Sequence, residues 1–192
     1  MKTPGVYIIE KNAFPNSVVE VATAIPAFIG HTQFARDGNK DLTGIPFRIS
    51  SMAEFHSFFG FAPTLRFGIR PEDSESEDTT NDINVLFPDG SCQLTLPKTF
   101  YALYYNMLLF YANGGGPCYI VSVGDYEHDF KSIDFTNALL ALKKEQEPTL
   151  VVVPEAVYME EGDCYKVQTA ALMHCGNDMK NRFAILDVFN GY

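Results

Sequence analysis

Four cysteines and four histidines are the side chains of this 192-residue sequence best suited to metal binding or nucleophilic chemistry. Cys164, His174 and Cys175 come closest to a zinc-ligand set, but adjacent helical residues point about 100° apart and no second ligand pair follows. Cys92 and Cys118 are equally isolated, and no CxxC pair or secreted disulfide pattern is present. We therefore expect reduced, mostly buried thiols and no metal site.

Signatures of nucleophilic and nucleotide chemistry are missing: the sequence holds no GxSxG, no HExxH and no Walker lysine. The glycines at 114–116 suggest a phosphate loop, but they follow a predicted helix and precede a predicted strand, which is the reverse of the order a phosphate requires. Glycines at the carbonyl end of a helix are typical of a C-cap. We expect no cofactor.

Asp187 is the best catalytic candidate, because it ends the last predicted strand, where α/β sheets often carry a functional carboxylate. No base or metal motif accompanies it, so we favour a role in capping the turn at Asn190 and Gly191. We expect no catalytic residues, and therefore no enzyme.

Composition excludes several classes of protein. A net charge of -10 disfavours nucleic acid as a partner, because binding its backbone requires lysines and arginines. A hydrophobic fraction of 46% excludes intrinsic disorder, and no apolar run is long enough for membrane insertion. Pro4 and Gly5 interrupt the place where a secretory signal would be apolar, so nothing marks the chain for export.

The elements that would position these residues begin with an extended arm over residues 1–17. Its β-prone run comprises Val6, Tyr7, Ile8 and Ile9, and turn-forming residues follow. Residues 18–31 have a strand pattern that Pro26 interrupts, which predicts an edge strand or a break. The arm has no tight turn that would fold it back as a hairpin, so we expect it to pair with a neighbouring subunit.

A capping box at residues 51–54 predicts a helix over residues 52–59, with Phe55, Phe58 and Phe59 facing the core and Gly60 ending it. Residues 70–82 hold six carboxylates and one basic residue, which predicts a solvated, outward-facing loop. Residues 83–87 and 92–96 flank a turn and predict a hairpin. Loop and hairpin, residues 70–96, form an insertion in a domain that spans residues 18–192.

Helices and strands alternate through the second half of the chain. We expect helices over residues 98–112, 135–145 and 163–177, and strands over residues 118–123, 149–153 and 183–188, the last two strands buried. This β-α-β-α-β order predicts an α/β fold, α+β overall, with a parallel sheet.

Four stretches resemble the contractile tail sheath proteins of bacteriophages and related contractile injection systems. They are residues 4–10 (PGVYIIE), residues 23–30 with 46–60 (TAIPAFIG, PFRISSMAEFHSFFG), residues 105–123 (with FYANGG and CYIV), and residues 151–155 with 182–187 (VVVPE, RFAILD). Ser122 stands where the family usually has an arginine. The family also normally continues into a C-terminal domain, whereas this sequence stops at Tyr192.

This resemblance implies a structural protein that polymerises helically around an inner tube and contracts to drive it through a target envelope. The implied partners are other sheath subunits, the inner tube protein, and baseplate and terminator proteins. Assembly would take place in the bacterial cytoplasm, in a virion tail or an injection-system particle. An α/β enzyme domain that binds a nucleotide or small ligand remains the alternative, and an adhesin or capsid-type module would predict disulfides or an export signal.

Overall fold

The computed structural model of this chain describes residues 24–65, 67–71, 82–87, 90–95 and 99–191. The predicted arm at residues 1–17, with the run at residues 6–9, lies outside the described residues. So does most of the predicted acidic loop, at residues 72–81.

A five-stranded sheet in the order β10-β9-β1-β8-β4 organises the fold, which is a mixed α/β fold as predicted. Four of its strands are mutually parallel, and β4 pairs antiparallel with β8. The strands are β1 (Pro26–Gly30), β4 (Phe47–Ile49), β8 (Cys118–Ser122), β9 (Leu150–Val152) and β10 (Phe183–Ile185).

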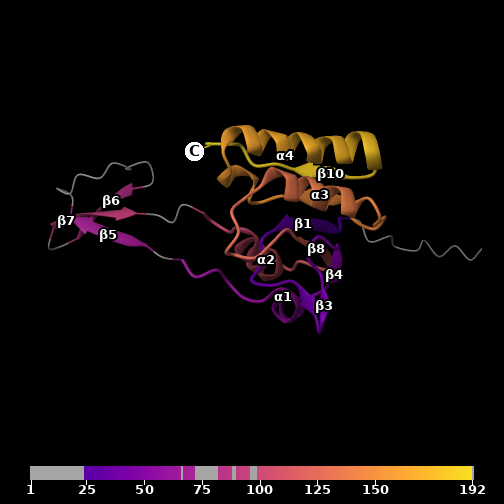
Figure 1. Cartoon of the computed structure of the whole chain (residues 1–192), viewed down its shortest axis with the longest axis horizontal. Helices are drawn as coiled ribbons and strands as arrows, with labels where there is room; N and C mark the ends of the chain where they lie inside the picture. The colour runs from indigo at the N-terminus through magenta and orange to yellow at the C-terminus, as the bar shows by residue number, and fades with distance from the viewer. Residues whose placement is uncertain (1–23, 66, 72–81, 88–89, 96–98, 192) are drawn as a thin grey trace, which may run out of the picture.

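Helices cover both faces of this sheet (Figure 1). On one face lie α3 (Ser132–Leu142) and α4 (Glu161–Met173), which pack on Ala27 and Ile29 of β1. On the other lie α1 (Met52–Phe59) and α2 (Leu103–Ala112), which pack on Phe28. Because side chains alternate along a strand, β1 supplies both cores.

A break in the strand pattern, one of the two predicted alternatives, agrees with the start of β1, whereas the edge strand that was the other alternative is not formed at Pro26. Pro26 is the first residue of β1, which lies between β8 and β9 and is buried along its whole length. Proline is tolerated at the first residue of a strand, because the missing N–H falls where the hydrogen-bonded ladder has just begun.

Helix α1 confirms its predicted bounds and cap. The Glu54 N–H donates to Ser51 Oγ at 3.2 Å, and Gly60 ends the helix at φ 86°. The Glu54 carboxylate accepts from the N–H of Ser50 at 2.7 Å, one residue earlier than a standard capping box. Phe55 and Phe59 are fully buried, whereas Phe58 is half-buried.

The later helices differ from prediction at their ends. α2 begins at Leu103, where its first N–H donates to Glu155 at 3.3 Å, so a residue distant in sequence fixes its start. α3 begins and ends three residues earlier than predicted. α4 begins two residues earlier and continues into a π-helical segment, His174–Met179. Gly114 confirms the predicted C-cap of α2, with φ 82°.

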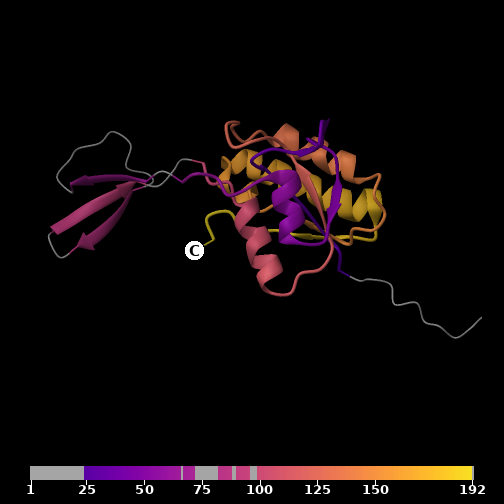
Figure 2. The ribbon, with the colours of Figure 1, turned by 90° about the horizontal axis from the view of Figure 1, so that it is seen from below.

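A second, three-stranded antiparallel sheet has the order β5-β7-β6 and stands apart from the α/β body (Figure 2). The predicted hairpin is confirmed by β6 (Asp82–Phe87) and β7 (Gly90–Thr95). The third strand, β5 (Gly68–Pro71), was not predicted, so both ends of the expected acidic loop belong to strands. A small hairpin of β2 (Arg36–Asp37) and β3 (Lys40–Asp41) follows β1.

Strand β10 is an exposed edge and not the buried strand that its composition predicts. The side chain of Phe183 is 76% exposed and that of Ile185 is 50% exposed. Only the opposite face of the strand, with Ala184, packs against the core under α3 and α4. Among the described residues, no helix is both long and apolar enough to cross a bilayer.

Candidate functional site

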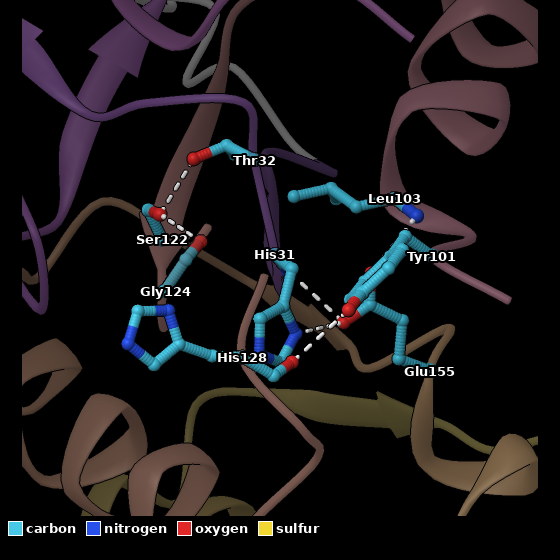
Figure 3. A network of polar contacts seen from close by, with 8 residues as sticks. All are labelled: His31, Thr32, Tyr101, Leu103, Ser122, Gly124, His128 and Glu155. Carbon is cyan, nitrogen blue, oxygen red and sulfur yellow. Dashed lines mark hydrogen bonds and ion pairs between the residues drawn. The ribbon is translucent and has the colours of Figure 1, made fainter. Parts of the chain in front are cut away.

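The carboxyl ends of β1, β8 and β9 bring three polar side chains to one edge of the sheet (Figure 3). His31 follows β1, Ser122 ends β8 and Glu155 follows β9. His31 and Ser122 are each 1% exposed, and Glu155 is completely buried. This is the edge at which open α/β sheets bind ligands.

Glu155 accepts three hydrogen bonds. One carboxylate oxygen, Oε2, accepts from the backbone N–H of His31 at 2.9 Å and lies 2.8 Å from His31 Nδ1. The other oxygen accepts from the N–H of Leu103 at the start of α2. One carboxylate therefore ties β1 and the first turn of α2 to the loop after β9.

Two opposing effects act on the protonation of Glu155. Burial raises its pKa, and the donors from His31 and Leu103 partly offset this shift by stabilising the anion. The His31 ring lies among aromatic rings, with centroids 5.0 Å from Phe130 and 5.3 Å from Tyr101. In the His31–Glu155 pair, hydrogen-bond donors therefore surround the carboxylate and aromatic rings surround the imidazole.

Gly30 makes this arrangement possible, because a Cβ there would lie 2.9 Å from Leu103 Cβ and 3.1 Å from the Glu155 carboxyl carbon. The contact requires a residue without a side chain at the end of β1. No local sequence pattern indicates His31, Glu155 or the reason for Gly30, since 124 residues separate His31 from Glu155.

Ser122 joins a separate pair of hydroxyls. Its Oγ lies 2.6 Å from Thr32 Oγ1 and donates to the carbonyl of Gly124 at 3.3 Å when it is not donating to Thr32. These hydroxyls link β1 to β8 across the sheet edge. Ser122 is thus a small side chain inside a buried hydrogen-bonded pair.

A His–Glu pair is a familiar arrangement for general-base catalysis, but this pair lacks two further requirements. Within the described part of the chain, no hydroxyl or thiol is hydrogen-bonded to His31. Its side chain is also almost completely buried, at 1% exposure. The arrangement is suited to holding three elements together.

A hollow of about 380 Å³ lies beside this network, between the segments that leave β1 and β8. These segments run toward opposite faces of the sheet, a topology that often creates a ligand crevice. Its charged lining is mainly acidic: Asp41, Asp125, Asp129 and Asp134, against Lys131. This charge disfavours phosphate and hence nucleotides.

Asp187 does not join this edge as a catalytic group. Its side chain is exposed, and its contact with the body is made by its backbone carbonyl, which accepts from the Gln168 amide at 2.8 Å. The turn at Gly191 closes on the carbonyl of Val188 instead, so the predicted capping role of Asp187 is also wrong.

The burial of the cysteines agrees with the prediction. All four are free; Cys118, Cys164 and Cys175 are buried and Cys92 is half-buried. Burial raises the pKa of Cys118 to about 11, which makes its thiol unreactive. In the described ranges, no three His, Cys, Asp or Glu side chains are grouped so as to hold a metal ion.

His174 and Arg182 form a second buried polar cluster, which no sequence pattern predicts. The Arg182 guanidinium donates to the carbonyls of Leu142 and Glu145, at the end of α3, and to His174 Nε2 at 2.9 Å. Burial and the neighbouring Arg182 charge lower the pKa of His174 to about 4. The imidazole is therefore neutral at pH 7 and accepts this hydrogen bond.

The outer edge of β10 is exposed at one end of the five-stranded sheet. One side of this strand pairs with β9, and no described strand pairs with the other. Its Phe183 and Ile185 are exposed, and Ile185 lines an apolar groove of about 690 Å³ between the sheet and α2. An unpaired edge with exposed apolar side chains is typical of a site that another chain covers.

No protein-family model matches this chain, and no curated protein matches it.

Proposed function

We propose that this protein is a structural subunit of a contractile sheath, which assembles helically around an inner tube and drives it through a target envelope. The observation that carries the proposal is the unpaired edge of β10 with its exposed Phe183 and Ile185. Such an edge can take a strand from another subunit, and contacts between different surfaces of identical subunits propagate as an open helix.

Two further observations support the proposal. The four motifs that resemble sheath proteins occur in the family's order along almost the whole sequence. The buried polar pair at the carboxyl edge of the sheet is enclosed, which favours a mechanical role for Glu155 over a catalytic one. The partners on this proposal are further sheath subunits, a tube protein, and baseplate and terminator proteins, with assembly in a bacterial cytoplasm.

Negative-stain electron microscopy of the purified chain at increasing concentration tests this function. We expect hollow helical filaments, or stacked rings, whose length grows with protein concentration. A chain that stays monomeric over the whole range, in low and in high salt, would contradict the proposal. Salt is varied because a net charge of -10 opposes self-association when it is unscreened.

The alternative is an α/β domain that binds a nucleotide or small ligand. The hollow between the ends of β1 and β8 favours a small ligand over a nucleotide, because its charged lining is mainly acidic. A thermal-shift screen with nucleotides and small cationic ligands distinguishes the two functions. Binding at a hundred times the dissociation constant would stabilise the fold by about 2.7 kcal/mol. The sheath proposal expects no such stabilisation.

A further inference from the structure

One face of the three-stranded sheet β5-β7-β6 is apolar. Residues directly opposite each other in an antiparallel sheet point to the same side, and so do residues two apart along one strand. Ile69 of β5 is opposite Leu94 of β7, and Val85 of β6 is opposite Cys92 of β7. These four side chains therefore share one side of the sheet, which we call the apolar sheet face.

No described part of the α/β body covers the apolar sheet face. The sheet stands apart from the body in two perpendicular views (Figure 1, Figure 2), and none of the four side chains belongs to either core of the body. Ile69 is 67% exposed. The opposite face is polar, with Arg70 opposite Gln93. A sheet with one apolar face normally buries it against another layer of structure, so this face is suited to an interface.

A second uncovered apolar surface lies on the outer side of α3 and α4, where a groove of about 590 Å³ runs between the two helices. We call it the α3–α4 groove. Ile133 of α3 and Tyr165 and Met173 of α4 line it, and they are 59%, 49% and 55% exposed. The inner sides of the same helices form the core, through Leu139 and Val167. Helices that are apolar on two sides are usually buried on both.

The two surfaces match in size and in chemistry. The sheet is about 14 Å wide and up to about 20 Å long at the usual strand spacing and rise. Two packed helices of 11 and 13 residues present a surface about 20 Å wide and about 17–20 Å long. Among the residues that line the groove, Lys166 is charged, and it pairs with Asp163 at 2.8 Å. Apolar side chains are therefore available on both sides of a contact between these surfaces.

Pairing of the sheet with the helices of another copy leaves neither surface uncovered. Two helices on one face of a small antiparallel sheet form a common two-layer arrangement, and each copy carries both layers at separate places. Packing of two sheet faces on each other would instead leave the α3–α4 groove of both copies exposed. The better occupant of the groove is therefore the apolar sheet face of a different copy.

We propose that the apolar sheet face of one copy of this chain packs on the α3–α4 groove of a second copy. The inference rests on the proposed function, because it names a contact between sheath subunits. The contact joins two different surfaces, so it can continue from copy to copy in an open helix. Its footprint of roughly 300 Å² is below the about 800 Å² that each partner buries in a standard interface. The contact is therefore weak alone and adds to other contacts between the same copies.

Cysteine cross-linking tests this contact directly. Cys92 lies on the apolar sheet face and is half-buried, whereas Cys118, Cys164 and Cys175 are buried and therefore poorly reactive. The partner variant combines Cys92→Ser with Thr169→Cys, at an exposed position that lines the groove. A link between Cys92 of the wild type and position 169 of the variant necessarily joins two chains. With a short bismaleimide we expect this link, identified by peptide mass spectrometry, in a yield that rises with protein concentration.

Matched variants control for random collision and for loss of folding. Ser57→Cys combined with Cys92→Ser places an equally exposed helical thiol on α1, which covers the opposite side of the body, and should give no cross-link. Thr136→Cys on α3 is a second groove position and should cross-link as position 169 does. Ile69→Lys in the wild-type chain, or Met173→Lys in the Thr169→Cys variant, should abolish the link. Circular dichroism checks that every variant is folded.

Three outcomes would overturn the docking proposal. Equal cross-linking of positions 57 and 169 would show that the contact is not specific. A dimer linked through Cys92 of both wild-type chains would show that the sheets pack on each other. A link within one chain that carries both Cys92 and Thr169→Cys, with none between chains, would show that the sheet folds back on its own helices.

The sheath function is judged separately, by electron microscopy of the same proteins. Helical filaments of the wild type without the link from Cys92 to position 169 would contradict the docking but not the function. The specific link in a wild-type sample that forms no filaments would contradict only the function.

Discussion

At the scale of single residues, the molecule depends on buried polar groups whose partners are distant in sequence. Glu155 accepts hydrogen bonds from both His31 and Leu103. Arg182 donates hydrogen bonds to His174 and to the end of α3. A buried charge is costly to leave without its partner, whereas an exposed ion pair contributes little. The two clusters are therefore expected to respond strongly to single substitutions.

Glu155→Ala should lower the free energy of unfolding by about 3–5 kcal/mol, because it leaves the His31 ring and the Leu103 N–H buried without their acceptor. Asp178→Ala is the control, since Asp178 is 39% exposed and pairs with Lys143, which is 38% exposed. It should cost at most about 1 kcal/mol. Urea unfolding measures both, and similar losses would contradict the role assigned to Glu155.

His174 should make the fold sensitive to acid. Its pKa is about 4 in the folded chain, against an ordinary value of 6.5 in the unfolded chain. Below pH 6.5, His174 is protonated in the unfolded chain but stays neutral in the folded chain. The free energy of unfolding therefore decreases as the pH falls to about 4. At pH 5 the loss is about 2 kcal/mol relative to pH 7.5.

Comparison with His174→Gln isolates this contribution, because acidic groups elsewhere titrate equally in both proteins. The stability difference between wild type and variant should shrink from pH 7.5 to pH 5. A difference that does not change with pH would show that His174 keeps an ordinary pKa in the folded state.

Among the helices and strands, the sequence predicts those ends that are determined by residues close by in the sequence. Helix α1 has its predicted bounds because Ser51 and Gly60 define its ends locally. The start of α2 at Leu103 depends on Glu155, and no residue near position 103 indicates it. The central place of β1 and the exposed edge of β10 depend on strand order, which pairs residues more than a hundred positions apart in β1 and β9.

Gly30→Ala should destabilise the end of β1 by about 1–3 kcal/mol, because the added Cβ would lie 2.9 Å from Leu103 Cβ in a packed region. Gly162→Ala is the control, since a Cβ in the first turn of α4 has no neighbour within 4 Å. It should be neutral or stabilising by up to about 1 kcal/mol. Equal stability of the two variants in urea would contradict the close approach at Gly30.

In the molecule as a whole, the polar side chains at the carboxyl edge of the sheet are buried, whereas the apolar side chains of the edge strand β10 are exposed. The first feature follows from the network of Glu155, and the second from the end position of β10 in the strand order. Composition could not predict this contrast, because Phe183 and Ile185 look like core residues in the sequence. Exposed apolar side chains along an unpaired strand are typical of an interface.

Electron microscopy of the wild type beside the variant lacking residues 2–11 tests the central claim, that this chain builds a sheath through its N-terminal segment. Both proteins are imaged under the same buffer and concentration, after circular dichroism shows that both are folded. We predict helical filaments with a hollow centre from the wild type and dispersed monomers from the variant. Filaments of equal length and symmetry from both proteins, or none from the wild type, would contradict the claim.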